Sequence, residues 1–142
     1  PDRAPLNGLC EAILGTGAEV RVLRDPTRGG VATTLNEFIE GTALGIELYE
    51  DKIPVRDQVR SACDMLGLDP LYCANEGKLL AVVAADDAER VLSSMRKTGE
   101  GRDAAIIGRV SAGYPGKLIM DTAFGGKRIL QKLTGAQLPR IC

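Results

Sequence analysis

A double glycine between a strand-like segment and a helix-like segment constrains the fold of this chain more than any other feature. Val20 to Leu23 reads as a short strand, and Gly29-Gly30 stands directly before a segment with helical apolar spacing. The apolar residues of that segment are Val31, Leu35, Phe38 and Ile39. A strand, a glycine turn and a helix in this order expose the N-terminal amides of the helix, which can bind an anion.

The loop from Arg24 to Gly30 supports two interpretations. Arg28 could present a planar cationic fork to a phosphate or a carboxylate. Alternatively, Asp25 and Thr27 cap the helix while the glycines make a tight turn. The residues by themselves leave both interpretations open.

The rest of the chain alternates irregularly between helix and strand patterns. Helices are predicted near 6–14, 55–66 and 87–95, and strands near 45–50, 78–85, 104–110, 117–121 and 128–133. The first helix has one apolar face, formed by Leu6, Leu9, Cys10, Ile13 and Leu14, and the second has another, formed by Val55, Val59, Ala62, Cys63 and Leu66. Along 45–50, Ile46 and Leu48 alternate with Glu47 and Tyr49, which predicts a half-exposed strand with Glu47 on its polar side. Some of these strands must pair antiparallel, so the predicted fold class is α+β. The run Leu79 to Ala85 is apolar throughout, which predicts a strand buried on both faces near the middle of a sheet. No internal repeat or linker is evident.

Length and composition exclude several classes of function. A chain of 142 residues is one domain by length, and its net charge of −1 gives no electrostatic case for nucleic acid or an anionic membrane. The longest apolar run is far too short to span a bilayer. The first residues do not resemble a signal peptide and include no Met, so we expect a processed product or a fragment.

The chain has four cysteines and no histidine. Zinc sites built from Cys and His, and catalysis by Ser-His-Asp or Cys-His, are therefore not expected, and we predict no metal ligands. Cys10 and Cys63 fall on apolar helical stripes and read as packing residues. Free thiols in a reducing cytoplasm are the expectation.

The fourth cysteine, Cys142, is the last residue. Pro139 keeps its approach extended, and the segment from Thr134 to Cys142 could reach roughly 25–30 Å, at about 3.3 Å per residue. One interpretation is a frayed end whose residue type is accidental. The other is a thiol that is carried into a neighbouring site.

Glu76 lies in the loop from Asp69 to Gly77, directly before the most apolar strand pattern. It is either a carboxylate at the mouth of a strand or a solvated turn residue.

Three segments carry a resemblance to a known family. They are Arg24-Asp25-Pro26-Thr27-Arg28-Gly29-Gly30-Val31, Ala74-Asn75-Glu76-Gly77-Lys78, and Pro139-Arg140-Ile141-Cys142. In this order and spacing the chain resembles the HypE family of hydrogenase maturation proteins over its whole length. The first segment is shared with the wider superfamily of aminoimidazole ribonucleotide (AIR) synthase, and the terminal segment is what distinguishes HypE.

The resemblance implies a layered α/β/α domain with a mixed sheet over 1–133, followed by a flexible tail over 134–142. It implies that an N-terminal domain, absent here, holds most of the site for ATP and Mg and forms a homodimer. A HypF-like protein would transfer a carbamoyl group to Cys142, ATP would be used to dehydrate it to a thiocyanate, and the cyanide would pass to a HypC–HypD scaffold for the nickel–iron hydrogenase site. The fragment is not expected to turn over by itself.

The resemblance also suggests roles for individual residues. Cys142 would be the acceptor, and Glu76 the best candidate base in a chain without histidine. The expected cofactor-binding residues are Asp25, Thr27, Arg28, Gly29, Gly30 and Asn75. Two other hypotheses stay open: an interaction module whose tail docks partners without chemistry, and another superfamily enzyme, such as a phosphoryl-transfer kinase, in which Cys142 is incidental.

Overall fold

Residues 4–133 are described in a computed structural model of the chain, and they fall into two units. Unit 1 is formed by Pro1–Pro26 and Asn75–Ile106. Unit 2 is formed by Thr27–Ala74 and Ile107–Cys142. The predicted tail, 134–142, lies outside the described residues, and so does its cysteine.

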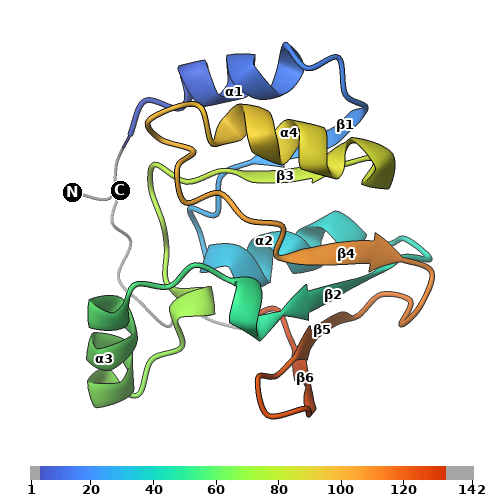
Figure 1. The fold of residues 1–142 in the computed structure, drawn as a ribbon. Helices are drawn as coiled ribbons and strands as arrows, with labels where there is room; N and C mark the ends of the chain where they lie inside the picture. The colour runs from blue at the N-terminus through green and yellow to red at the C-terminus, as the bar shows by residue number, and fades with distance from the viewer. Residues whose placement is uncertain (1–3, 134–142) are drawn as a thin grey trace. The chain divides into compact units, whose positions relative to one another are not determined.

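Unit 1 is a two-stranded antiparallel sheet with two helices. Its elements are α1 (Asn7–Leu14), β1 (Val20–Arg24), β3 (Leu80–Val83), the 3₁₀ turn η3 (Ala85–Asp87) and α4 (Ala88–Met95), and β1 pairs with β3. The two helices lie side by side (Figure 1). Leu9 and Ile13, one turn apart on α1, form a buried cluster with Val91 of α4. Helical spacing in the sequence therefore located this core.

The prediction of a central strand in the apolar run was wrong in this structure. Strand β3 is shorter than the run, it pairs with β1 alone within the described part of the chain, and its four residues are half-buried. An unbroken apolar run indicates that a strand is shielded from water, but it does not indicate how many strands flank it.

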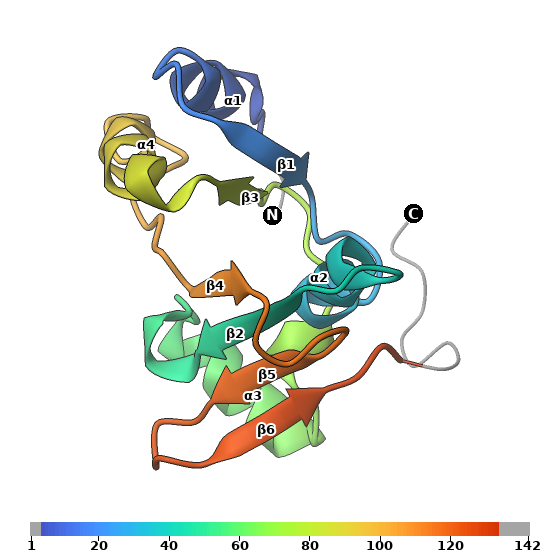
Figure 2. The ribbon, with the colours of Figure 1, turned by 90° about the vertical axis from the view of Figure 1, so that its right-hand side faces the viewer.

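Unit 2 contains a four-stranded mixed sheet in the order β4-β2-β5-β6 (Figure 2). The strands are β2 (Gly45–Tyr49), β4 (Gly108–Ser111), β5 (Leu118–Asp121) and β6 (Lys127–Leu130). Strand β2 runs parallel to β5, whereas the β2–β4 and β5–β6 pairs are antiparallel. The predicted α+β class with a mixed sheet is confirmed.

The register of these strands separates an apolar face from a polar face. Residues paired across neighbouring strands point to the same side of a sheet. One side accordingly carries the buried residues Ile46, Leu48, Leu118, Met120 and Leu130. The other side, called the polar face, carries Glu47, Arg109, Ser111, Asp121 and Lys127 around the apolar Ile119 and Ile129.

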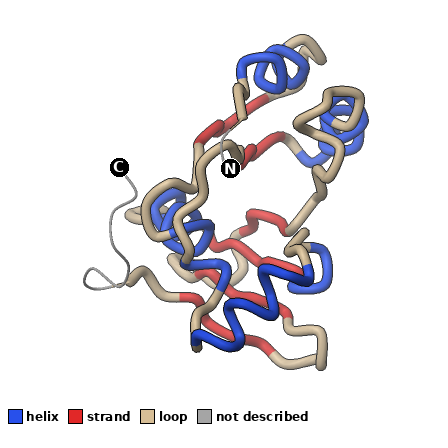
Figure 3. Tube along the Cα trace, turned by 90° about the vertical axis from the view of Figure 1, so that its left-hand side faces the viewer, coloured by secondary structure: helices blue, strands red, loops and turns tan. Residues whose placement is uncertain are grey.

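The described part of unit 2 also contains two helices and two 3₁₀ turns. They are α2 (Gly30–Ile39), α3 (Asp57–Leu66), η1 (Glu50–Lys52) and η2 (Pro70–Tyr72). Helix α2 packs against β2, β5 and η2. Helix α3 lies over one face of the sheet (Figures 2 and 3). Of the apolar stripe predicted for α3, Cys63 is buried, whereas Val59 and Leu66 are exposed.

Candidate functional site

The entry to α2 is fixed by two glycines in the left-handed region. Gly29 has φ 68° and Gly30 has φ 64°. A Cβ atom on Gly29 would meet the Thr33 side chain at 2.3 Å, and one on Gly30 would meet the carbonyl oxygens of Leu71 at 2.4 Å and Cys73 at 2.6 Å. Both glycines are therefore required by the backbone conformation and by packing within unit 2.

The first turn of α2 has unused hydrogen-bonding capacity. Its N-cap is Gly29, so the helix begins without a capping side chain at that position. The hydroxyl oxygen of Thr33 is buried and has no hydrogen-bond partner among the described residues. The first-turn amides of a helix and a hydroxyl suit an oxyanion or a carbonyl oxygen, so this turn is chemically compatible with a phosphate group.

The candidate residues of the first loop are divided between the units. Asp25 is exposed and belongs to unit 1. Half-buried Thr27 and exposed Arg28 belong to unit 2, together with the two glycines.

The second candidate segment lies beside the first loop within unit 1. The Asn75 amide donates to the carbonyl of Pro26 at 3.2 Å, and Lys78 Nζ donates to Asn75 Oδ1 at 2.9 Å. Glu76 is half-buried in the turn before β3. The structure thus brings Asp25 and Asn75 to neighbouring segments of one unit.

The three described thiols differ from an activated nucleophile. Cys63 is buried and Cys10 is half-buried. The Cys73 thiol donates to the Asp69 carbonyl at 3.6 Å, and burial first, then the neighbouring Cys63 and Asp69, raise the pKa of Cys73. A raised pKa leaves less thiolate at neutral pH, so Cys73 is a poor acceptor.

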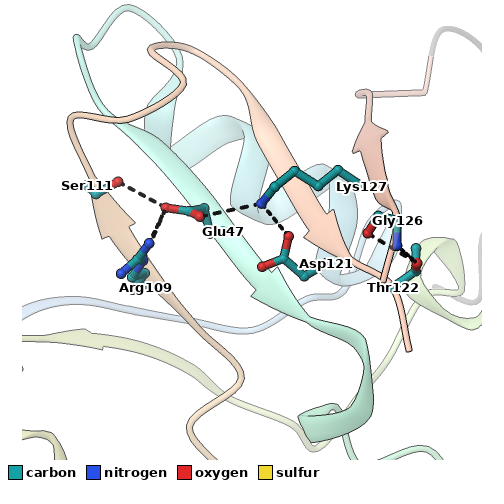
Figure 4. A network of polar contacts seen from close by, with 7 residues as sticks. All are labelled: Glu47, Arg109, Ser111, Asp121, Thr122, Gly126 and Lys127. Carbon is teal, nitrogen blue, oxygen red and sulfur yellow. Dashed lines mark hydrogen bonds and ion pairs between the residues drawn. The ribbon is translucent and has the colours of Figure 1, made fainter. Parts of the chain in front are cut away.

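A polar network that the sequence reading missed lies on the polar face of the sheet (Figure 4). Glu47 is only 6% exposed, and its Oε1 accepts from Arg109 Nε at 3.1 Å and from Ser111 Oγ at 3.4 Å. Lys127 Nζ lies 3.9 Å from Glu47 Oε2 and 2.5 Å from Asp121 Oδ1. It also lies 5.5 Å from the centre of the Tyr114 ring.

The cations of this network are held in their charged form. The hydrogen bond to Glu47, followed by its charge, raises the pKa of Arg109. The hydrogen bond to Asp121 is the main cause that raises the pKa of Lys127. Alternation along β2 predicted that Glu47 points to water, whereas the network and the β4–β5 turn cover it. The sequence did contain one signal for this network, because charged and hydroxyl residues occur in several of the predicted strands.

A cleft of about 310 Å³ lies between α3, η2 and the sheet in unit 2. Its lining combines apolar residues with Arg60, Asp64, Asp69 and Arg128, and the last two form an ion pair with each other. Of the candidate residues in the described part of the chain, none lines this cleft.

Within 4–133 no helix has the length and apolarity that a bilayer crossing requires. Nor do the residues in that range place three His, Cys, Asp or Glu side chains where they could hold a metal ion together.

Comparison with known proteins identifies the class to which this fold belongs. The chain is a member of the family of AIR synthase related proteins, and the model of their C-terminal domain matches residues 2–121. Within this class, its similarity is to HypE. The chain is 53% identical over 141 residues to "Carbamoyl dehydratase HypE" of Azotobacter vinelandii, a match that covers 99% of this chain and 41% of the relative.

Solved structures agree with this assignment. HypE in complex with ATP matches with a TM-score of 0.91 and 45% identity, over 99% of this chain and 43% of that one. A HypE–HypF complex matches with a TM-score of 0.86 and 45% identity, over 92% and 42%. The resemblance to HypE is confirmed, and the chain spans about two fifths of the length of these relatives.

Proposed function

We propose that this chain is the C-terminal part of a HypE-like carbamoyl dehydratase, with a domain over 1–133 and a carrier tail over 134–142. The observation that carries the proposal is the terminal Pro139-Arg140-Ile141-Cys142, joined to a chain that is similar throughout to proteins named carbamoyl dehydratase. We take the compartment to be the cytoplasm, as proposed for a hydrogenase maturation protein.

In the first step Cys142 accepts a carbamoyl group. Its thiolate attacks the carbamoyl carbon of the donor, an S–C bond forms, and the bond from that carbon to the donor's leaving group breaks. Thiolates suit a group that is received and passed on, because they are both good nucleophiles and good leaving groups. The solved HypE–HypF complex supports a HypF-like protein as the donor.

In the second step the S-bound carboxamide loses the elements of water and becomes a thiocyanate. ATP supplies the driving force by phosphorylation of the carboxamide oxygen, which leaves as phosphate with ADP as the other product. The two nitrogen protons must go to a base. Glu76 is our candidate, because it is a half-buried carboxylate in a chain without histidine.

The nucleotide would be held mainly by the part of the protein that this chain lacks, with Mg beside it. The ATP complex of a similar HypE supports nucleotide binding. Asp25, Thr27, Arg28 and the Gly29 and Gly30 amides would lie on the phosphate side or receive the tail, with Asn75 beside Asp25. The first turn of α2, whose N-cap Gly29 has no capping side chain, fits an oxyanion there.

The remaining partners follow from the product. Cleavage of the thiocyanate sulfur–carbon bond into a thiolate and a cyanide takes up two electrons. A HypC–HypD-like scaffold would supply these electrons together with the iron that receives the cyanide. In the full-length protein we expect a homodimer formed through the N-terminal part.

Mass spectrometry of the full-length protein tests this proposal. With carbamoyl phosphate, a HypF-like protein and ATP, we expect about +43 Da on Cys142, followed by about +25 Da after dehydration, from the masses of the groups that replace hydrogen on the thiol. Adducts on another residue would reject Cys142 as the carrier. The absence of any adduct would favour an interaction module.

A further inference from the structure

The chain is held by two separate elements where it leaves β6. The Tyr72 hydroxyl of η2 donates to the Gln131 carbonyl at 2.9 Å, and the Asn36 side-chain amide of α2 donates to the Leu130 carbonyl at 3.0 Å. Lys132 Nζ lies 3.3 Å from Glu40 and 3.7 Å from Glu37, both on α2. We call the four residues Asn36, Glu37, Glu40 and Tyr72 the exit anchor.

The two elements of the exit anchor are packed against each other at backbone distance. Because Gly30 has no side chain, the start of α2 comes close to the carbonyls of Leu71 and Cys73. Asp69 stabilises turn η2, because its carboxylate accepts a hydrogen bond from the Leu71 amide at 2.9 Å. The donors of Tyr72 and Asn36 therefore project from one packed substructure.

The contacts of the exit anchor differ in their exposure to water: the Asn36 hydrogen bond is partly buried, and the Tyr72 hydrogen bond is exposed. The ion pairs of Lys132 are half-exposed, and such pairs contribute little because water and salt screen them. Hydrogen bonds to the main-chain carbonyls of Leu130 and Gln131 do not depend on the side chains of those residues. The Tyr72 hydroxyl is protonated and able to donate at neutral pH, and burial is the main cause that raises its pKa further.

We propose that the exit anchor positions the carrier thiol by fixing the origin of the tail, and that Tyr72 and Asn36 are its positioning residues. This inference rests on the proposed function. With the chain held up to Lys132, ten residues remain to Cys142, and the thiol can reach no further than roughly 33–36 Å from that point. A fixed origin raises the effective concentration of the thiol at a site within that radius.

Limited trypsin digestion of the full-length protein tests whether the exit anchor holds the chain. The segment offers two cleavage points, after Lys132 beside the anchor and after Arg140 beyond it. In a Tyr72→Phe/Asn36→Ala double variant we expect cleavage after Lys132 to accelerate about tenfold, from the loss of two hydrogen bonds. Cleavage after Arg140 is the internal control and should keep its rate.

The variants are chosen so that they fold. Tyr72→Phe removes one oxygen and keeps the ring, and Asn36→Ala places the best helix former inside α2. Tyr114→Phe, which removes a hydroxyl from the β4–β5 turn of the same unit, is the matched control and should leave both cleavage rates unchanged. Each single variant should give a smaller acceleration after Lys132 than the double variant.

The positioning role is tested by separating the two chemical steps. In the double variant we expect carbamoylation of Cys142 to proceed at its normal rate, because a HypF-like donor comes to the tail. Dehydration of the carbamoylated protein should slow about threefold or more, because the tethered group reaches its own site less often. Loss of the fold would reduce both steps together, so this split identifies positioning.

Either of two results would overturn the inference: equal cleavage after Lys132 in the wild type and the double variant, or an unchanged dehydration rate in the double variant. Failure of the proposed function has a different signature. If Cys142→Ala still accepted carbamoyl, both the carrier role of Cys142 and the positioning role of the exit anchor would be rejected. The digestion would still report whether the exit anchor holds residues 130–132.

Discussion

At the scale of single residues, Glu47 shows how charge and burial are reconciled in this protein. The carboxylate is buried on a strand, yet its main partner Arg109 keeps 63% of its side chain exposed. Glu47 therefore bears most of the free-energy cost of desolvation. Removal of Arg109 would leave the Glu47 carboxylate without its strongest hydrogen-bond donor. The pair is therefore asymmetric, and its two members should respond differently to substitution.

We predict that Arg109→Ala lowers the urea midpoint of the full-length protein at least about three times as much as Arg21→Ala, because it strands a buried carboxylate. Arg21 is the control, since its ion pair with Glu19 is exposed on both sides, at 61% and 60%. Equal effects of the two substitutions in urea denaturation would show that Lys127 and Ser111 suffice for Glu47.

Glu76 is the residue on which the proposed proton transfer depends. We predict that Glu76→Gln leaves carbamoylation of Cys142 nearly unchanged and slows thiocyanate formation by about 10²–10⁴-fold, because an amide of the same size cannot take a proton at neutral pH. Single-turnover mass spectrometry follows both steps. A Gln variant that dehydrated at the normal rate would make Glu76 a turn residue and assign the base elsewhere.

At the scale of elements, the contact of α2 with η2 fixes the start of α2, which directly follows the candidate loop. The glycine pair was the strongest sequence signal for a strand–turn–helix unit, and β1 and α2 confirm that unit. The structure adds that the close approach permitted by Gly30 is to the carbonyls of Leu71 and Cys73. The same glycine therefore shapes the helix start and seats the element that carries Tyr72.

A matched pair of glycines measures this contact. Gly30 and Gly41 both have positive φ, at 64° and 73°, but a Cβ on Gly41 meets nothing within 4 Å. We predict that Gly41→Ala costs about 1–2 kcal/mol for the left-handed backbone, and that Gly30→Ala costs about 2 kcal/mol more because of the overlap. Chemical denaturation of both variants gives the difference, and similar costs would mean that η2 moves aside.

At the scale of the whole molecule, the proposed activity requires a thiol that can leave the surface of its own domain and reach a partner protein. Cys10, Cys63 and Cys73 are each half-buried or buried within the described units. The exit anchor places the start of the remaining chain on unit 2. The tail would thus carry the reacting thiol, whereas the described units would hold the start of the tail. Cysteine substitutions can distinguish these two roles.

We predict that Cys142→Ala abolishes carbamoyl acceptance, whereas Cys10→Ala, Cys63→Ala and Cys73→Ala retain it. The raised pKa of Cys73 keeps its thiol protonated at neutral pH, and Cys63→Ala should mainly reduce stability because it removes a buried sulfur. Adduct mass after incubation with the donor system is the measurement. Acceptance that survived in Cys142→Ala, or moved to Cys73, would contradict the carrier proposal.

The sequence by itself determined the class of the fold, the strand–turn–helix unit at Gly29-Gly30, the helical core positions Leu9 and Ile13, and the resemblance to HypE. These features depend on local periodicity, backbone preference and short motifs, all of which are written along neighbouring residues. Tertiary structure decided the partners of β3, the burial of Glu47, the exposure of much of α3 and the contacts of Tyr72 with Gln131. Each of these depends on segments some 60 residues or more apart in the chain, or on the number of neighbours around an element, and local pattern carries no record of either.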